Sequence, residues 1–95
     1  MATYLTTVRF TPTGLAAIQD TTKRAATFKT AAKKLGVKVA ATYWTLGDYD
    51  GLLVLEAADD QAVTKALIEL AALGNVRTAT VPAFTAGEID KLLSK

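Results

Sequence analysis

Cysteine and histidine are both absent from this 95-residue sequence. Without cysteine the chain has neither disulfides nor thiolate chemistry, and the absence of histidine as well removes the usual ligand sets for zinc and iron. No glycine-rich segment has the form of a phosphate-binding loop. We therefore expect no cofactor and no metal, since only carboxylates and water would remain to hold a hard cation.

Long apolar runs and a large charge excess are absent too. No segment approaches the roughly 20 apolar residues that a membrane-spanning helix needs, and Met1 leads into a strand-like segment without a secretory signal pattern. We expect a cytoplasmic protein with no membrane partner. The net charge of +2 is too small to favour nucleic acid as a partner. Basic residues do cluster between positions 23 and 38, and we interpret them as a solvated helix face: Lys23, Arg24, Lys29, Lys33, Lys34 and Lys38.

The chain is rich in apolar residues for its size. At 51% hydrophobic and 21% charged residues, it carries more apolar surface than a small core can bury. Residues 1–95 are too few for a second core, so we expect a single domain. A partner subunit would cover the excess apolar surface, and we therefore expect a homo-oligomer, either a dimer or a larger closed assembly.

Strand-like segments alternate with segments of helical periodicity. The first helix is expected to start at Thr11-Pro12, an N-cap followed by a proline at the first helical position, and to run to Gly36. Its apolar spacing has one gap at Thr22. The second helix is expected between a cap at Asp59 or Asp60 and the stop signal Gly74-Asn75. The predicted strands are Thr3–Phe10, Val37–Leu46, Leu52–Ala57 and Val76–Val81, and a short C-terminal helix is expected over Gly87–Leu93.

This order of elements predicts an α+β domain with the ferredoxin-like βαββαβ pattern. We expect an antiparallel sheet with strand order 4-1-3-2 and both long helices on one face. The run Gly47–Gly51 has the composition of a turn and joins the second and third strands. The third strand is apolar without alternation over Leu52–Leu55, so both of its faces favour burial, and we expect the helix-free face to meet another subunit.

Three blocks of the sequence resemble the GYD-domain family. They are Tyr43–Asp50, which contains the Gly47, Tyr49 and Asp50 pattern, then Leu53–Ala57 with Asp59-Asp60, and then Ala72–Thr78. The resemblance covers nearly the whole chain and implies a ferredoxin-like domain of small bacterial proteins, similar to the dimeric α+β barrel group. It implies no particular activity. The chain departs from the family pattern at Ala58, where a proline is usual, and at Pro82, where a basic residue is usual.

Polar residues are expected to gather at one edge of this sheet, where the first strand ends, the turn lies and the fourth strand begins. They lie near the first helix N-terminus at Thr13 and Gly14, whose free amides favour an anion. In a structural interpretation Asp50 pairs with an arginine and Tyr49 packs over the turn. In a functional one Asp50 is a general base or anchor, Tyr49 donates its hydroxyl and the arginines bind a carboxylate. The candidate cluster consists of Arg9, Tyr49, Asp50, Asn75 and Arg77.

Two further features have a structural and a functional interpretation. The aromatic residues could line a pocket between sheet and helices, although we interpret them as core: Tyr4, Phe28, Tyr43, Trp44 and Phe84. Glu56 lies on the apolar third strand and is expected to reach water or to bond Tyr4, because an unpaired carboxylate is costly to bury.

Several functions fit these features. The first hypothesis is a small oligomeric protein that binds a small molecule or a protein partner. The alternatives are a cofactor-free isomerase or monooxygenase using Asp50, Tyr49 and an arginine, and a self-assembling structural protein. Lack of histidine counts against the enzyme, because a shifted carboxylate or a tyrosine would then do the acid and base work. Nucleic-acid binding would rest on the basic cluster alone.

Overall fold

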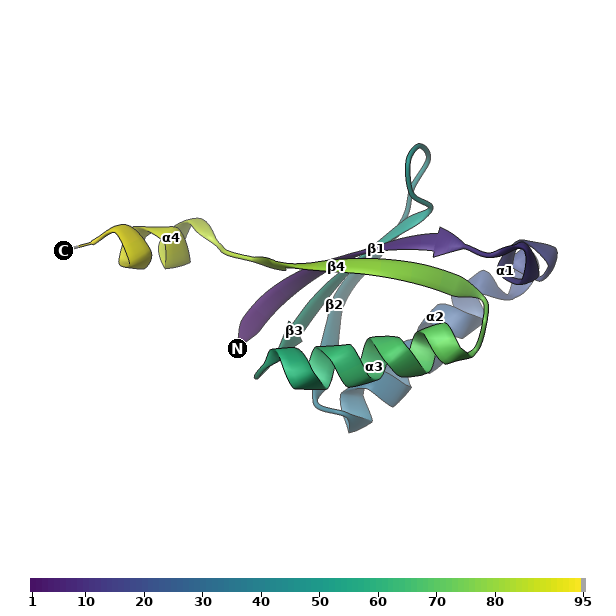
Figure 1. The fold of residues 1–95 in the computed structure, drawn as a ribbon, viewed down its shortest axis with the longest axis horizontal. Coiled ribbons are helices and arrows are strands. Elements are labelled where there is room, and N and C mark those ends of the chain that lie inside the picture. The colour runs from purple at the N-terminus through teal and green to yellow at the C-terminus, as the bar shows by residue number, and fades with distance from the viewer. Residues whose placement is uncertain (95) are drawn as a thin grey trace.

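A four-stranded antiparallel sheet carries the long helices on one face (Figure 1). The computed structural model describes residues 1–94. The strand order β2-β3-β1-β4 confirms the predicted ferredoxin-like α+β fold. Its elements are β1 (Ala2–Phe10), α1 (Pro12–Ala16), the 3-10 turn η1 (Ile18–Asp20), α2 (Thr21–Lys34), β2 (Val37–Trp44), β3 (Gly51–Ala57), α3 (Asp60–Ala72), β4 (Val76–Ala83) and α4 (Ala86–Leu93).

The core lies between the sheet and helices α2 and α3. Alternate residues of β1 and β3 are buried, because successive side chains of a strand point to opposite faces and only one face is covered by helices. Thr6 is the buried polar residue, and its hydroxyl shares a 2.7 Å hydrogen bond with Thr80. The apolar core consists of Tyr4, Val8, Phe28, Ala32, Val37, Val39, Leu53, Leu55, Ala57, Val63, Ala66 and Leu67.

The prediction of one continuous first helix is wrong. Helix α1 ends at Ala16, and Ala17 has φ −113° and ψ 33°, outside the helical region. The Arg24 guanidinium donates to the carbonyl oxygens of Ala17 (2.8 Å) and Gly14 (3.2 Å). These hydrogen bonds satisfy acceptors that the end of α1 leaves free. The gap in apolar spacing at Thr22 lies in the first turn of α2, just after this break. It was the feature of the sequence that could have indicated the break.

The two edge strands of the sheet are both irregular. Strand β2 has a register shift between Val39 and Ala41, where it pairs with β3. Strand β4 continues two residues past the predicted end at Val81 and includes Pro82, which an edge strand tolerates because its outer groups need no partner. Neither edge is therefore a regular row of hydrogen-bonding groups.

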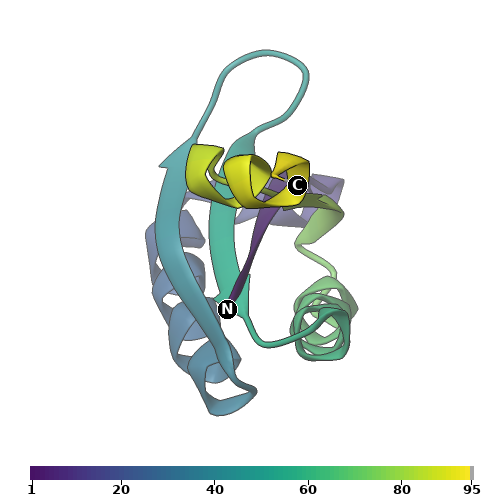
Figure 2. The same cartoon turned by 90° about the vertical axis from the view of Figure 1, so that its left-hand side faces the viewer.

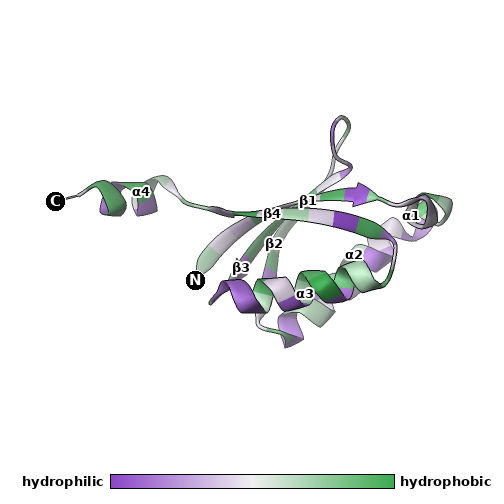
Figure 3. Ribbon diagram, in the orientation of Figure 1, coloured by the Kyte–Doolittle hydropathy of each residue, from purple (hydrophilic) through white to green (hydrophobic). Residues whose placement is uncertain are grey.

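Helix α4 lies beyond the end of β4, away from α2 and α3 (Figure 1), and it stands in front of the strands in the view along the long axis (Figure 2). It begins at Ala86, one residue before the prediction, because Thr85 and Glu88 form a reciprocal capping box. Apolar residues occupy one side of it (Figure 3), and Leu92 and Leu93 are 67% and 77% exposed. The helix thus leaves an apolar side in solvent.

Candidate functional site

Asp50 fastens the loop between β2 and β3 to strand β1. Its Oδ2 accepts a hydrogen bond from the Phe10 amide at 2.9 Å, and its own amide donates to the Val8 carbonyl oxygen at 2.8 Å. The expected ion pair between Asp50 and an arginine is wrong, because the ion pair found within residues 1–94 joins Lys38 and Glu56 at 4.0 Å. The Asp50 carboxylate is therefore engaged by the backbone.

Arg9 and Arg77 lie side by side on the helix-free face. They are paired positions of β1 and β4, and both are exposed. Arg9 Nη1 donates to the carbonyl oxygen of Asp48 in the loop. Tyr49 is half-buried, and its carbonyl oxygen accepts from the Thr45 hydroxyl at 2.6 Å. The structure thus places Arg9 at the loop and Arg77 beside Arg9, and within residues 1–94 neither arginine has a carboxylate partner.

Asn75 belongs to a different contact, between α1 and the start of β4. Its carbonyl oxygen accepts from the Thr11 amide at 3.1 Å, and a Cβ on Gly14 would lie only 2.0 Å from that oxygen. The Gly14 amide, which was expected to face an anion, donates instead to the Thr11 hydroxyl at 3.1 Å. The five predicted site residues therefore divide between two places.

The helix-free face of the sheet, here called the open face, has an apolar centre. Val81 and Tyr43 are 56% and 57% exposed. Charged residues lie at both ends of the face, with Arg9 and Arg77 at one end and the Lys38–Glu56 pair at the other. By strand register the apolar centre consists of Leu5, Ala41, Tyr43, Leu52, Val54, Ala79 and Val81.

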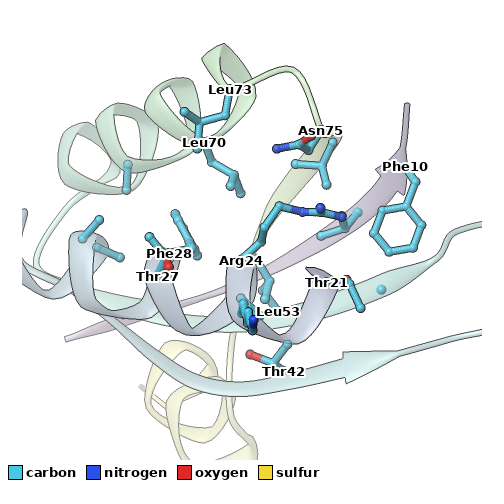
Figure 4. Close-up of a pocket in the computed structure, with 18 of the residues that line it drawn as sticks. Phe10, Thr21, Arg24, Thr27, Phe28, Thr42, Leu53, Leu70, Leu73 and Asn75 are labelled. Atoms are coloured by element: carbon cyan, nitrogen blue, oxygen red, sulfur yellow. The ribbon is translucent and has the colours of Figure 1, made fainter. Parts of the chain in front are cut away.

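The helix-covered face holds a cavity of about 680 Å³ between α2, α3 and the sheet (Figure 4). Phe28 and Leu70 line it from the two helices, and Leu53 lines it from the sheet. Trp44 lies at its β2 side, where the indole Nε1 donates to the Thr21 hydroxyl at 3.0 Å. Helices α2 and α3 therefore do not close over the sheet completely.

The aromatic residues divide between core, cavity and surface. Tyr4 and Phe28 are core residues, as interpreted from the sequence, but Tyr43, Trp44 and Phe84 are exposed, which the core interpretation missed. Chain ends and sheet edges leave such residues uncovered in an isolated chain. Periodicity alone does not distinguish these positions from buried ones.

The Tyr4 hydroxyl donates to Asp60 Oδ1 at 2.5 Å. This hydrogen bond, together with burial, raises the pKa of Tyr4 to about 12. Asp60 is free for this contact because Asp59 is the N-cap of α3 and accepts from the Ala62 amide at 3.0 Å. Glu56 lies on the open face, so the expected bond between Glu56 and Tyr4 is not formed.

Sequence reasoning missed Arg24, which it placed on the solvated helix face. Arg24 is half-buried and lines the cavity, while its guanidinium binds two carbonyl groups of the α1 segment. The available signal was its residue type, since Arg24 is the arginine among the lysines of α2. A planar guanidinium suits fixed acceptors better than a lysine ammonium does.

Residues 1–94 offer neither a membrane span nor a metal cluster. Within residues 1–94, no helix combines the length and apolar character needed to cross a membrane. The same part of the chain contains no group of three or more acidic side chains placed to hold a metal ion.

The pattern of the GYD domain family matches residues 4–93. The chain belongs to the GYD domain family. A curated relative in Thermus thermophilus, named glutamine synthetase and cystathionine beta-lyase binding protein, is 39% identical over 57 residues. That alignment covers 60% of this chain and 60% of the relative, less than two thirds of its length.

Solved structures share the fold of this GYD domain. TTHA0845 from Thermus thermophilus has a TM-score of 0.59 at 24% identity, over 90% of this chain and 96% of that one. A mutant of Rv3291c has a TM-score of 0.68 at 15% identity, and MtbAldR (Rv2779c) has 0.62 at 15% identity. The matches cover 90% and 88% of this chain, respectively, and 52% of each neighbour. These identities support the fold alone.

Proposed function

We propose that this GYD-domain protein is a non-enzymatic binding module that associates with itself through the open face and holds a protein partner. The observation that carries the proposal is the uncovered apolar centre of that face. Leu5, Leu52 and Val54 lie on a face that no helix covers, beside the exposed Val81. Contiguous apolar patches of this kind mark interaction surfaces in soluble proteins.

Helix α4 is a second uncovered apolar surface and supports the same proposal. It continues from β4, and its Ile89, Leu92 and Leu93 are exposed beyond the end of the sheet. A second copy is a suitable cover for both surfaces, because a two-fold interface needs only one self-complementary patch.

Charge placement favours a pair whose strands run in opposite directions. Arg77 lies at the start of β4, beside Arg9 of β1. Helix α4 follows the end of β4 and carries Glu88 and Asp90 against one lysine, Lys91. In such a pair the α4 of each copy lies near the arginines of the other. Opposite charges would then meet at both ends of the interface.

A protein partner beyond a second copy is supported by the Thermus relative, whose name states that it binds two enzymes. We extend to this chain the general property of binding a metabolic enzyme, and we propose a cytoplasmic location for it. Titration of the purified chain with purified glutamine synthetase tests this part by calorimetry. Heats that match a buffer control would remove the enzyme partner from the proposal.

Self-association is tested by sedimentation equilibrium at micromolar concentration. The wild type is expected at a multiple of the 10.0 kDa chain mass, and Val54→Asp is expected near the chain mass because it places a carboxylate in the apolar centre. Ile68→Asp is the matched control, since Ile68 is 63% exposed on α3, away from the open face. A wild type at 10.0 kDa would overturn self-association.

The alternative of a cofactor-free isomerase or monooxygenase has less support in this geometry. It needs Asp50 as a base, but the Asp50 carboxylate accepts a hydrogen bond from the Phe10 amide. We therefore assign Asp50 to the loop and do not adopt the enzymatic alternative.

A further inference from the structure

We propose that the cavity between α2, α3 and the sheet binds a small carboxylic acid with an aromatic or branched apolar body, and that Arg24 binds its carboxylate. The cavity lies on the opposite side of the sheet from the apolar centre of the open face, although Leu52 and Tyr43 contribute to both. It therefore adds a small-molecule ligand to a module that we propose for protein binding.

The size and lining of the cavity set the apolar part of the ligand. Its volume of about 680 Å³ falls in the range of known small-molecule sites. Protein interiors are close-packed and rarely leave voids much larger than a water molecule. Figure 4 places Phe28, Leu53 and Leu70 around the hollow, on three different elements. An apolar body would gain contacts with all three.

Arg24 supplies the positive charge at one end of the cavity. Its guanidinium donates to the carbonyl oxygens of Ala17 and Gly14, which fix its orientation without neutralising its charge. A guanidinium has more N–H donors than these two carbonyl groups use. Within residues 1–94 Arg24 has no carboxylate partner. Arg24 is thus a cation of fixed orientation that has further N–H donors available to a ligand.

The other charged side chains of the lining do not cancel the preference of the cavity for an anion. Asp20, Lys23 and Glu69 also line the cavity, but all three are exposed and so are screened by water, whereas Arg24 is half-buried. In Figure 4, Asn75 lies near the end of the Arg24 side chain. A carboxylate placed there would meet the guanidinium and the Asn75 amide, with its apolar body toward Phe28.

Two probes test the charge preference, naphthoate and its uncharged analogue naphthamide, each titrated into the full chain by heteronuclear NMR. Naphthoate is expected to bind about tenfold more tightly, because its carboxylate forms an ion pair with Arg24, whereas the amide of naphthamide is uncharged. Its shifts are expected at Phe28, Leu53 and Leu70. Equal affinity for the two probes, or shifts confined to Leu5 and Val54 on the open face, would overturn the proposal.

Matched variants separate the apolar and charged parts of the site. Ala25→Phe fills the cavity that Ala25 lines and is expected to weaken both probes about tenfold, whereas Ala26→Phe, on an exposed position outside the lining, leaves them unchanged. Arg24→Gln is expected to remove the difference between the probes, while Arg24→Lys retains part of it and Lys29→Gln retains all of it.

Two outcomes distinguish a failure of the cavity site from a failure of self-association through the open face. Full naphthoate affinity in Ala25→Phe would overturn the cavity site, and this result does not depend on whether Arg24→Gln folds. Val54→Asp is expected to keep naphthoate binding, because it alters only the open face. Loss of naphthoate binding in Val54→Asp would show that the cavity site requires the assembly. It would overturn the inference that the cavity acts independently of the open face.

Discussion

Asp50 and Arg24 both order the chain by binding backbone groups that are distant in sequence. Asp50 was predicted to pair with an arginine beside the turn Gly47–Gly51, but its partner is the Phe10 amide. A local pattern identifies a turn, whereas the partner depends on how the loop lies against another strand. The same limit applies to Arg24, whose acceptors exist only because the first helix breaks.

Replacing Asp50 tests its contact with the Phe10 amide. We expect Asp50→Ala to lower the free energy of unfolding by about 1 to 3 kcal/mol, since it leaves a part-buried N–H without an acceptor. Asp50→Asn keeps an acceptor oxygen and should lose less. Asp48→Ala, on an exposed neighbour in the same loop, is the control in urea denaturation. Equal midpoints for Asp48→Ala and Asp50→Ala would place the Asp50 carboxylate in solvent.

Tyr4 gives the fold a dependence on alkaline pH. Its pKa rises from 10.0 to about 12 in the folded chain, so folding favours the neutral phenol. The stabilisation is present below the ordinary pKa of 10.0 and is lost as the pH rises from 10.0 to about 12. Melting temperatures across this range should fall more for the wild type than for Tyr4→Phe. Parallel curves for the two proteins would contradict the assignment.

Helices and strands were predicted well where one signal sufficed. A cap at Asp59 or Asp60, the stop at Gly74 and the strand order all followed from local pattern and topology, and Asp59 is the cap in the structure. The break after α1 was missed because a proline start and apolar spacing with a single gap, at Thr22, favour a continuous helix. It depends instead on a close contact between α1 and the loop before β4, which no local spacing specifies.

Gly14→Ala tests that contact. The added Cβ would lie 2.0 Å from the Asn75 carbonyl oxygen, so α1 or the loop must move, and we expect a loss of about 1 to 3 kcal/mol in unfolding free energy. Gly87→Ala is the matched control, because in α4 the nearest atom is 4.0 Å from the added Cβ and alanine favours a helix. Thermal unfolding compares them. A Gly14→Ala protein as stable as Gly87→Ala would refute the close packing.

For the molecule as a whole, the apolar composition predicted that part of the apolar surface contacts another subunit. The open face of the sheet is an apolar surface at which such a contact is possible. The cavity could not be predicted in this way. Its volume depends on the distance between α2 and α3, which is set by side-chain packing along both helices together, and a sequence pattern specifies only which residues face inward.

Assembly should make the stability of the molecule depend on its concentration. If folded copies associate, mass action stabilises them, and the melting temperature should rise between about 1 and 100 µM chain. Val54→Asp should melt at one temperature throughout that range. A wild type whose melting temperature is also constant would exclude association as a source of stability.

The irregular edges of the sheet restrict how copies can add to one another. A regular outer strand can pair with a strand from the next molecule without limit, which leads to fibres. Here the register shift in β2 and Pro82 in β4 interrupt both outer rows of backbone groups. Growth by strand addition is therefore disfavoured. A two-fold contact through the open face would occupy that face in both molecules and leave it unavailable to a further copy. The proposed assembly would therefore be a finite complex and not a fibre.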